Sequence, residues 1–378
     1  MRFTSLLLLL PALAFPQDNE RVANAMREMI RAKEIPGAVT LIATRDRVTH
    51  LQAVGNAGPG AASKPLRKNS IFWIASMTKP ITGTAILMLQ EDGKLSVDDL
   101  VSKHIPALAN LKTPSGNPAN LTLKHLMTHT SGLPEATNDE AKAARTLADL
   151  IPAYLNKPMQ FEPGVKWQYC QSGINTLGRI VEVVSGMPFE KFLEKRLFKP
   201  LGMKDTTFYL RPGQLSRLVT PARREPDGAL TEAAISLLQG KAPTSTDRYP
   251  AANGGLFSTA PDYARFARMI LNQGTLEGKR YLKPESVKQM TTIQTGSIVT
   301  GFTPGNGWGL AWCVVREPQG VSAMLGAGAH GHGGAYGTQA WIDPVNGVAL
   351  ILMVQRSNFA NSDASPVRLA FQQAAMAK

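Results

Sequence analysis

Residues 71–82 read Ile71-Phe72-Trp73-Ile74-Ala75-Ser76-Met77-Thr78-Lys79-Pro80-Ile81-Thr82, and the rest of the chain is interpreted around them. From Lys79 to Gln90, apolar side chains recur at helical spacing, and Gly93 is a natural end for a helix. Pro80 is compatible with this helix only in its first turn, where backbone N–H groups lack partners anyway. We therefore expect Ser76 at or just before the helix N-terminus, with Lys79 about one turn later on the same side.

This arrangement suits a serine nucleophile. A serine hydroxyl attacks poorly until a neighbouring base takes its proton. A lysine can be that base only if it is buried or lies near another cation, and the apolar residues 71–74 could bury it. The N–H groups at a helix N-terminus would stabilise a developing negative charge. Because a Ser-x-x-Lys pair occurs about once by chance in a chain of this length, a capping serine followed by a surface lysine stays an alternative.

The N-terminus has the pattern of a secretory signal. Arg2 precedes a run of five leucines, and the segment ends in Ala12-Leu13-Ala14. We expect cleavage after Ala14, a mature chain of residues 15–378, and export to the periplasm or beyond. The leucine run is too short to span a bilayer comfortably, and no later stretch predicts a membrane helix.

Composition and charge limit the class of partner. The 378 residues are 43% hydrophobic and 18% charged, as in ordinary globular proteins of one or two domains. The net charge of +13 favours anionic partners such as cell-wall polymers or lipid surfaces. The basic residues are scattered, so we expect no nucleic-acid binding. Export would permit Cys170 and Cys313 to pair, but two cysteines are no disulfide framework, and we expect them unpaired.

The order of elements predicts an α+β fold with an all-α subdomain. A helix at 19–32 precedes strands at 38–43 and 48–54, while strands at 307–315, 332–342 and 348–354 precede a final helix at 363–373. We expect an antiparallel sheet flanked by helices and built from both chain ends, about 19–75 plus 290–378, with a helical insertion of about 80–285. Residues 212–250 lack clean periodicity and suggest a lid or pocket wall.

One histidine pair raises the question of a metal. His125 and His129 lie four residues apart, which can place two ligands on one helix face. Leu126 occupies the position where a zinc protease motif needs Glu, and no acidic third ligand is nearby. We therefore expect neither a metal nor an organic cofactor.

Three stretches together resemble the serine β-lactamase and penicillin-binding protein superfamily. They are Ser76-x-x-Lys79, Tyr169-Cys170-Gln171 in a loop, and His332-Gly333-Gly334-Ala335 at a strand. In detail the chain is most similar to class C β-lactamases, family VIII carboxylesterases and D-alanyl-D-alanine peptidases, over about residues 35–354. The resemblance implies the β-lactamase/transpeptidase-like fold and a covalent acyl-enzyme on serine.

The resemblance also implies a role for each site residue. Ser76 is the expected nucleophile, Lys79 its base, and Tyr169 the residue that shares the proton transfer. A tyrosinate beside a lysine is physically reasonable, because each partner favours the charged form of the other. The oxyanion donors would be the backbone N–H groups of Ser76 and Ala335. The expected substrate-binding residues are Gln171, His332, Gly333 and Gly334.

Two departures from the superfamily pattern bear on the substrate. Gln171 stands where the tyrosine element has Asn, and His332-Gly333-Gly334 stands where the strand has Lys-Thr-Gly. The titratable ring of His332 thus replaces the permanent cation of Lys, and Gly333 lacks the hydroxyl that Thr provides.

These departures favour a neutral, short-chain ester as substrate, and hence a family VIII-type carboxylesterase. A class C-like β-lactamase, a D-alanyl-D-alanine carboxypeptidase and a non-catalytic ligand-binding homologue stay open as alternatives. We expect a monomer.

Overall fold

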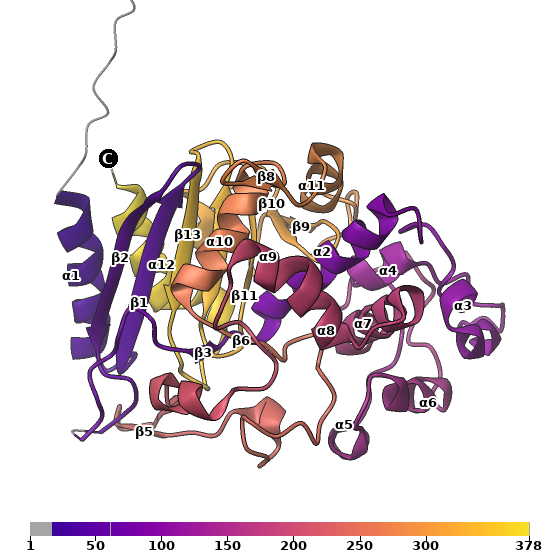
Figure 1. Ribbon diagram of the computed structural model, residues 1–378, viewed down its shortest axis with the longest axis horizontal. Helices are drawn as coiled ribbons and strands as arrows, with labels where there is room; N and C mark the ends of the chain where they lie inside the picture. The colour runs from indigo at the N-terminus through magenta and orange to yellow at the C-terminus, as the bar shows by residue number, and fades with distance from the viewer. Residues whose placement is uncertain (1–16, 61, 378) are drawn as a thin grey trace, which may run out of the picture.

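The computed structural model describes residues 17–60 and 62–377, so the predicted signal at 1–14 lies outside the described residues. Its main feature is a seven-stranded antiparallel sheet (Figure 1). The strand order is β2 (Val48–Gly55), β1 (Gly37–Thr44), β13 (Val348–Met353), β12 (Gln339–Asp343), β11 (His330–Gly333), β10 (Cys313–Val315) and β9 (Asn306–Trp308). Strand β1 lies beside β13, with Val39 opposite Met353, so the prediction of a sheet built from both chain ends is confirmed.

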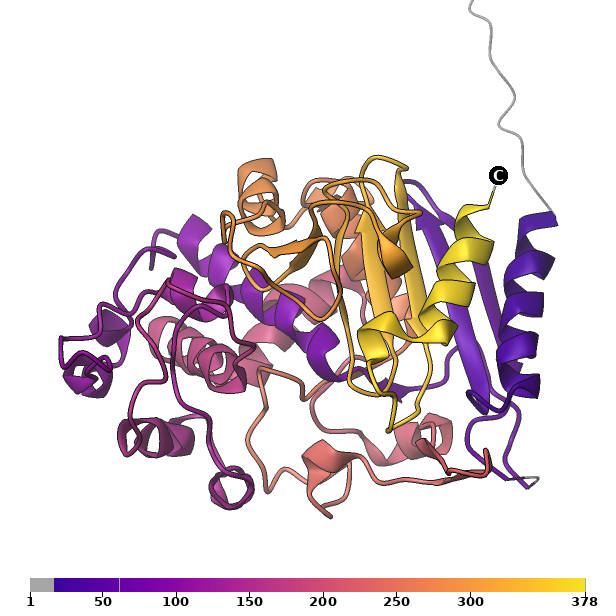
Figure 2. The same cartoon turned by 180° about the vertical axis from the view of Figure 1, so that it is seen from behind.

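Helices cover both faces of the sheet because its strands alternate. In β13, Leu350 and Leu352 face one buried cluster, while Ile351 and Met353 face another. The first cluster lies under α1 (Gln17–Arg31) and α12 (Pro366–Met376), which are seen in front of the sheet in Figure 2. The second lies under α10 (Ala260–Leu271), in front of the sheet in Figure 1, and extends to α2 (Thr78–Glu91).

Two predicted strands are in fact hairpins, so those two predictions were wrong. The segment 307–315 turns between β9 and β10, where Ala311 has a φ of 66° and its N–H donates to Met127 O at 2.8 Å. The segment 332–342 turns between β11 and β12, where Gly337 has a φ of 90°. Both turns lack Asn and Pro, and the apolar residues that continue through them conceal the reversal.

Helix α2 is central and buried all round, whereas its sequence predicted one apolar face. Every residue from Thr78 to Leu89 is buried. Its hydroxyls are satisfied inside the protein: Thr82 Oγ1 donates to Ala252 O at 2.7 Å, and Thr84 Oγ1 donates to Pro80 O at 2.9 Å. Polar residues on this helix therefore do not mark a solvent face. Pro80 lies in the first turn, as predicted.

Most of the remaining helices lie on the side of α2 that faces away from β1 and β2 (Figure 1). The helices are α3 (Val101–His104), α4 (Leu123–Met127), α5 (Asn138–Ala143), α6 (Ile151–Leu155), α7 (Gln171–Ser185), α8 (Phe189–Leu193), α9 (Lys199–Leu201) and α11 (Pro284–Thr291). The described residues also form three two-stranded pairs: β3 (Phe72–Trp73) with β6 (Phe257–Ser258), β4 (Ala222–Arg224) with β5 (Leu230–Glu232), and β7 (Thr275–Leu276) with β8 (Lys279–Arg280). Within the described ranges, no helix combines the length and apolar character that a membrane crossing requires.

Candidate active site

Ser76 lies in a short 3₁₀ turn, Ala75–Met77, that runs directly into α2. Ala75 has a φ of 46°, a left-handed conformation that is costly for a residue with a β-carbon. Thr78 holds this turn, because its Oγ1 donates to Ala75 O at 2.7 Å and accepts from Leu256 N at 3.2 Å. The strained turn thus places the Ser76 side chain at the start of the helix, as the spacing predicted.

Lys79 lies beside Ser76 with the geometry of a base. Its Nζ is 3.0 Å from Ser76 Oγ and donates to Asn253 O at 2.7 Å. The side chain is fully buried, and this burial lowers the pKa of Lys79 to about 7, against smaller opposite effects of Glu135, Cys170 and Asp363. A neutral amine can donate to Asn253 O and still offer its lone pair to the serine proton.

Tyr169 precedes α7 and lies over the same lysine. Lys79 Nζ is 4.6 Å from the centre of the Tyr169 ring. Burial of the hydroxyl raises the Tyr169 pKa well above its ordinary value, although the hydrogen bond with Ser76 acts the other way. Burial thus favours the uncharged forms of Tyr169 and Lys79 over a tyrosinate beside an ammonium.

His332 lies on β11 next to Tyr169. Its Nδ1 is 2.7 Å from Gly333 O, a carbonyl that can only accept, so Nδ1 carries the proton. Nε2 is then free to accept from Tyr169 Oη at 3.4 Å. Burial, with a smaller effect of Lys79, lowers the pKa of His332 to about 3. The ring is therefore neutral at physiological pH.

The two glycines after His332 leave no room for side chains. A β-carbon on Gly333 would lie 1.9 Å from Asp363 Oδ1, and one on Gly334 would lie 2.6 Å from Ile74 O. The close approach of Gly334 to Ile74 brings Ala335 next to the segment that carries Ser76. The use of the Ser76 and Ala335 N–H groups as oxyanion donors stays a prediction.

Gln171 is engaged within the protein. Its Oε1 accepts from Asn253 Nδ2 at 2.9 Å, and Asn253 is the residue whose carbonyl binds Lys79. The longer Gln side chain therefore joins α7 to the segment that holds the base. Substrate binding by Gln171 stays a prediction.

One family model matches most of the chain. The model described as Beta-lactamase covers residues 22–375. The chain belongs to the beta-lactamase family. Two relatives are Protein Rv1367c of Mycobacterium tuberculosis, 30% identical over 90% of this chain and 91% of its own, and Esterase EstB of Burkholderia gladioli, 26% identical over 93% of each. A solved structure of EstCE1, titled a hydrolase with promiscuous acyltransferase activity, superposes with a TM-score of 0.83 at 22% identity, covering 95% of this chain and 98% of its own.

As a beta-lactamase-family protein, the chain is a serine hydrolase. Its fold is the β-lactamase/transpeptidase fold that the sequence predicted. Ser76, Lys79 and Tyr169, the three predicted catalytic residues, lie close together; their roles in catalysis stay a prediction.

Glu135 is a site residue that the sequence motifs did not predict. Its carboxylate accepts hydrogen bonds from the first residues of α7. Its Oε2 accepts from Ser172 N at 2.9 Å and Ser172 Oγ at 2.6 Å, and Oε1 accepts from Gln171 N. The N–H groups at a helix start favour such an anion. The only sequence signal was the position of Glu135 after Ser131-Gly132-Leu133-Pro134, which does not identify α7 as its partner.

His125 and His129 have structural roles. His125 Nδ1 accepts from Thr122 N in the cap of α4, and His129 Nδ1 accepts from Cys170 N at 3.1 Å. In residues 17–60 and 62–377, no three His, Cys, Asp or Glu side chains are grouped as metal ligands. Cys170 and Cys313 are buried, and both are free cysteines in the structure.

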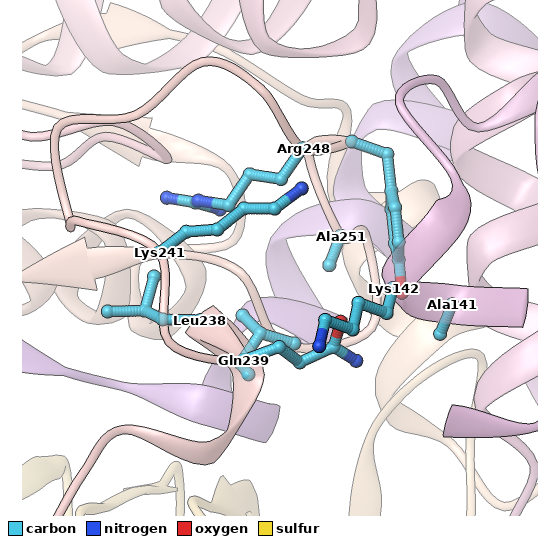
Figure 3. Close-up of a pocket in the computed structure, with 9 residues that line it drawn as sticks. Ala141, Lys142, Leu238, Gln239, Lys241, Arg248 and Ala251 are labelled. Atoms are coloured by element: carbon cyan, nitrogen blue, oxygen red, sulfur yellow. The ribbon is translucent and has the colours of Figure 1, made fainter. Parts of the chain in front are cut away.

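The irregular segment predicted as a pocket wall does border a pocket. Figure 3 shows Lys142 and Ala141 of α5 facing Leu238, Gln239, Lys241, Arg248 and Ala251 across it. Ala251 lies two residues before Asn253, so this wall continues into the segment that holds Lys79. Tyr336, directly after Ala335, also holds the segment, because its Oη donates to Ala234 O at 2.8 Å.

Proposed function

We propose that this protein is an exported carboxylesterase that hydrolyses short-chain esters through an acyl-enzyme on Ser76. The observation that carries the choice of an ester is the neutral His332, whose pKa is lowered to about 3. A β-lactam or a peptide C-terminus presents a carboxylate, which an uncharged ring attracts weakly. An ordinary ester has no carboxylate, so its binding does not require a cation at the position of His332.

The reaction divides into acylation and deacylation. Ser76 Oγ attacks the ester carbonyl while its proton passes to Lys79 Nζ, 3.0 Å away. Tyr169, which hydrogen-bonds Ser76, passes a proton to the alcohol oxygen as the C–O bond breaks. Water then attacks the acyl-serine and gives a proton to Tyr169, which regains its hydroxyl. Lys79 returns its proton to Ser76 Oγ as the bond to the acyl group breaks, and the acid is released. Export rests on the sequence of residues 1–14 and would be checked by N-terminal sequencing of the mature protein.

A paired assay tests the proposed function. The purified protein is given p-nitrophenyl butyrate and the chromogenic cephalosporin nitrocefin, each with a Ser76→Ala control. We expect ester turnover that falls at least about a thousandfold in the variant, and little nitrocefin turnover. A fluorophosphonate should label wild-type Ser76 and not the variant.

Each other outcome contradicts a definite part of the proposal. Fast nitrocefin turnover would make the protein a β-lactamase. Full ester activity in Ser76→Ala would remove the mechanism. Absence of both labelling and turnover would favour a ligand-binding homologue without catalysis.

A further inference from the structure

The neutral Lys79 amine must direct its lone pair at Ser76, and one main-chain carbonyl restricts that direction. Lys79 is fully buried, and its Nζ donates to Asn253 O at 2.7 Å while lying 3.0 Å from Ser76 Oγ. A carbonyl oxygen only accepts, so it fixes one N–H of the amine and thereby limits where the lone pair can point. Under the proposed function, on which this inference rests, Lys79 is the base. The position of Asn253 O therefore controls how well the base faces the nucleophile.

Asn253 lies in a turn, and helix α7 holds it at two points. The main-chain N–H of Asn253 donates to Asn175 Oδ1 at 3.2 Å, and its side-chain Nδ2 donates to Gln171 Oε1 at 2.9 Å. Gln171 and Asn175 are four residues apart on α7, so their amides lie on the same face of the helix. These two amides thus hold the residue whose carbonyl binds Lys79.

The residues on either side of Asn253 are held as well. Ala252 O accepts from Thr82 Oγ1 at 2.7 Å, and Gly254 O accepts from Trp73 Nε1 at 2.7 Å. Neither hydrogen bond involves the Asn253 side chain, so the turn stays attached to α2 and β3 when that side chain is changed. We therefore expect loss of the Gln171 contact to shift the Asn253 carbonyl without unfolding the turn.

The length of the side chain at position 171 matters for this contact. The superfamily pattern has Asn where this chain has Gln171. An Asn side chain is one methylene shorter, so from the same backbone position its oxygen would fall short of the 2.9 Å contact with Asn253 Nδ2. The departure from the pattern at this position is thus what connects α7 to Asn253.

We propose that Gln171 and Asn253 are positioning residues for Lys79. Gln171 acts through the Asn253 side chain, and Asn253 acts through its carbonyl. This role differs from the substrate binding that the resemblance implies for Gln171, because Asn253 already engages Gln171 Oε1. It predicts an effect on the rate of the chemical step and none on the affinity for the substrate.

Covalent labelling of Ser76 by a fluorophosphonate tests the proposal in a double-mutant cycle of Gln171→Met and Asn253→Leu. Both changes remove the amide and keep a side chain of similar size. The measurement is made at about pH 9, where Lys79, with a pKa of about 7, is neutral. Each single variant should lower the maximal labelling rate about tenfold and leave the half-saturating probe concentration within about twofold.

The double variant distinguishes one shared contact from two separate effects. It should also lose about tenfold, because a single hydrogen bond joins the two residues. A loss of about a hundredfold in the double variant would overturn the proposal. A raised half-saturating concentration with an unchanged maximal rate in Gln171→Met would overturn it too, and would favour substrate binding by Gln171.

Two further variants control for folding and for the loss of an amide. Gln90 Nε2 donates to Gln289 Oε1 at 2.9 Å, a contact of the same kind between α2 and α11, so Gln289→Met should change the labelling rate less than about twofold. Gln171→Asn keeps an amide without the reach and should repeat the loss of Gln171→Met, whereas a wild-type rate would overturn the proposal. Urea unfolding checks that each variant folds, and Gln171→Asn decides the test if Asn253→Leu does not.

The labelling assay also separates this proposal from the proposed function. If wild-type Ser76 is labelled but p-nitrophenyl butyrate is not hydrolysed, the proposed function fails and the cycle still tests the positioning of Lys79. An absence of labelling in wild type would overturn both, because Lys79 would then not activate Ser76.

Discussion

At the scale of single residues, the proposed mechanism makes the buried Lys79 amine the group that sets the pH at which the enzyme works. The base acts only when neutral, and burial lowers its pKa to about 7. We expect kcat/KM for p-nitrophenyl butyrate to rise through about pH 7 and stay level to about pH 9, because Tyr169 keeps its proton throughout. A pH–rate profile measures this. A rise centred near the ordinary lysine pKa would contradict it and assign the base to another state of Lys79.

The sequence predicted which residues meet, but not the charges that they carry. The Ser76 and Lys79 spacing is local, so helix geometry alone placed the pair. The charge state of Tyr169 depends on atoms from several distant segments, and a sequence does not show how completely they exclude water. The sequence likewise does not show that Asp363, near the start of α12, fills the space beside Gly333 of β11.

At the scale of elements, the N-terminus of α7 positions Tyr169 and connects it to Lys79. Glu135 accepts from the first N–H groups of this helix, and its charge also raises the pKa of Lys79. We therefore treat Glu135 as a positioning residue. In Glu135→Gln, the acid limb of the pH–rate profile should move to lower pH, and kcat should fall about tenfold as the loop loosens.

A matched variant distinguishes this effect from a general loss of charge. Glu285 is exposed at the first turn of α11, so Glu285→Gln should leave both kcat and the acid limb unchanged. A lower kcat in Glu135→Gln with an unmoved acid limb would show that Glu135 only caps α7.

At the scale of the whole molecule, the chain ends make the sheet and the middle of the chain makes the helices around α2. This order followed from the sequence because strand and helix periodicities differ clearly at 38–54 and 348–354. The turns inside 307–315 and 332–342 were missed because tertiary contacts, such as that of Ala311 N–H with Met127 O, impose them on apolar sequence. The sequence thus predicts the helices and strands around the site better than it predicts the tertiary contacts that pack them together.

The same packing makes stability depend on pH through buried neutral histidines. His330 is 3% exposed and packs edge-to-face against Trp312, and burial lowers its pKa to about 4. Because the folded pKa lies below the unfolded one, the unfolded state binds more protons between about pH 4 and 6.5, and stability falls as pH drops through this window. One such histidine costs about 1 kcal/mol between about pH 6.5 and 5.5.

The variant His330→Asn removes this titration while its amide can still donate to Gly328 O, the partner of His330 Nδ1 at 3.0 Å. In urea unfolding at about pH 7.5 and 5.5, we expect the variant to lose about 1 kcal/mol less free energy of unfolding on acidification than wild type. His332→Asn, on the same buried strand, should flatten the profile in the same sense, since the pKa of His332 is also lowered, to about 3. A His330→Asn protein with the wild-type acid dependence would mean that the folded state takes up the proton at His330 without cost, and that other groups set the acid sensitivity.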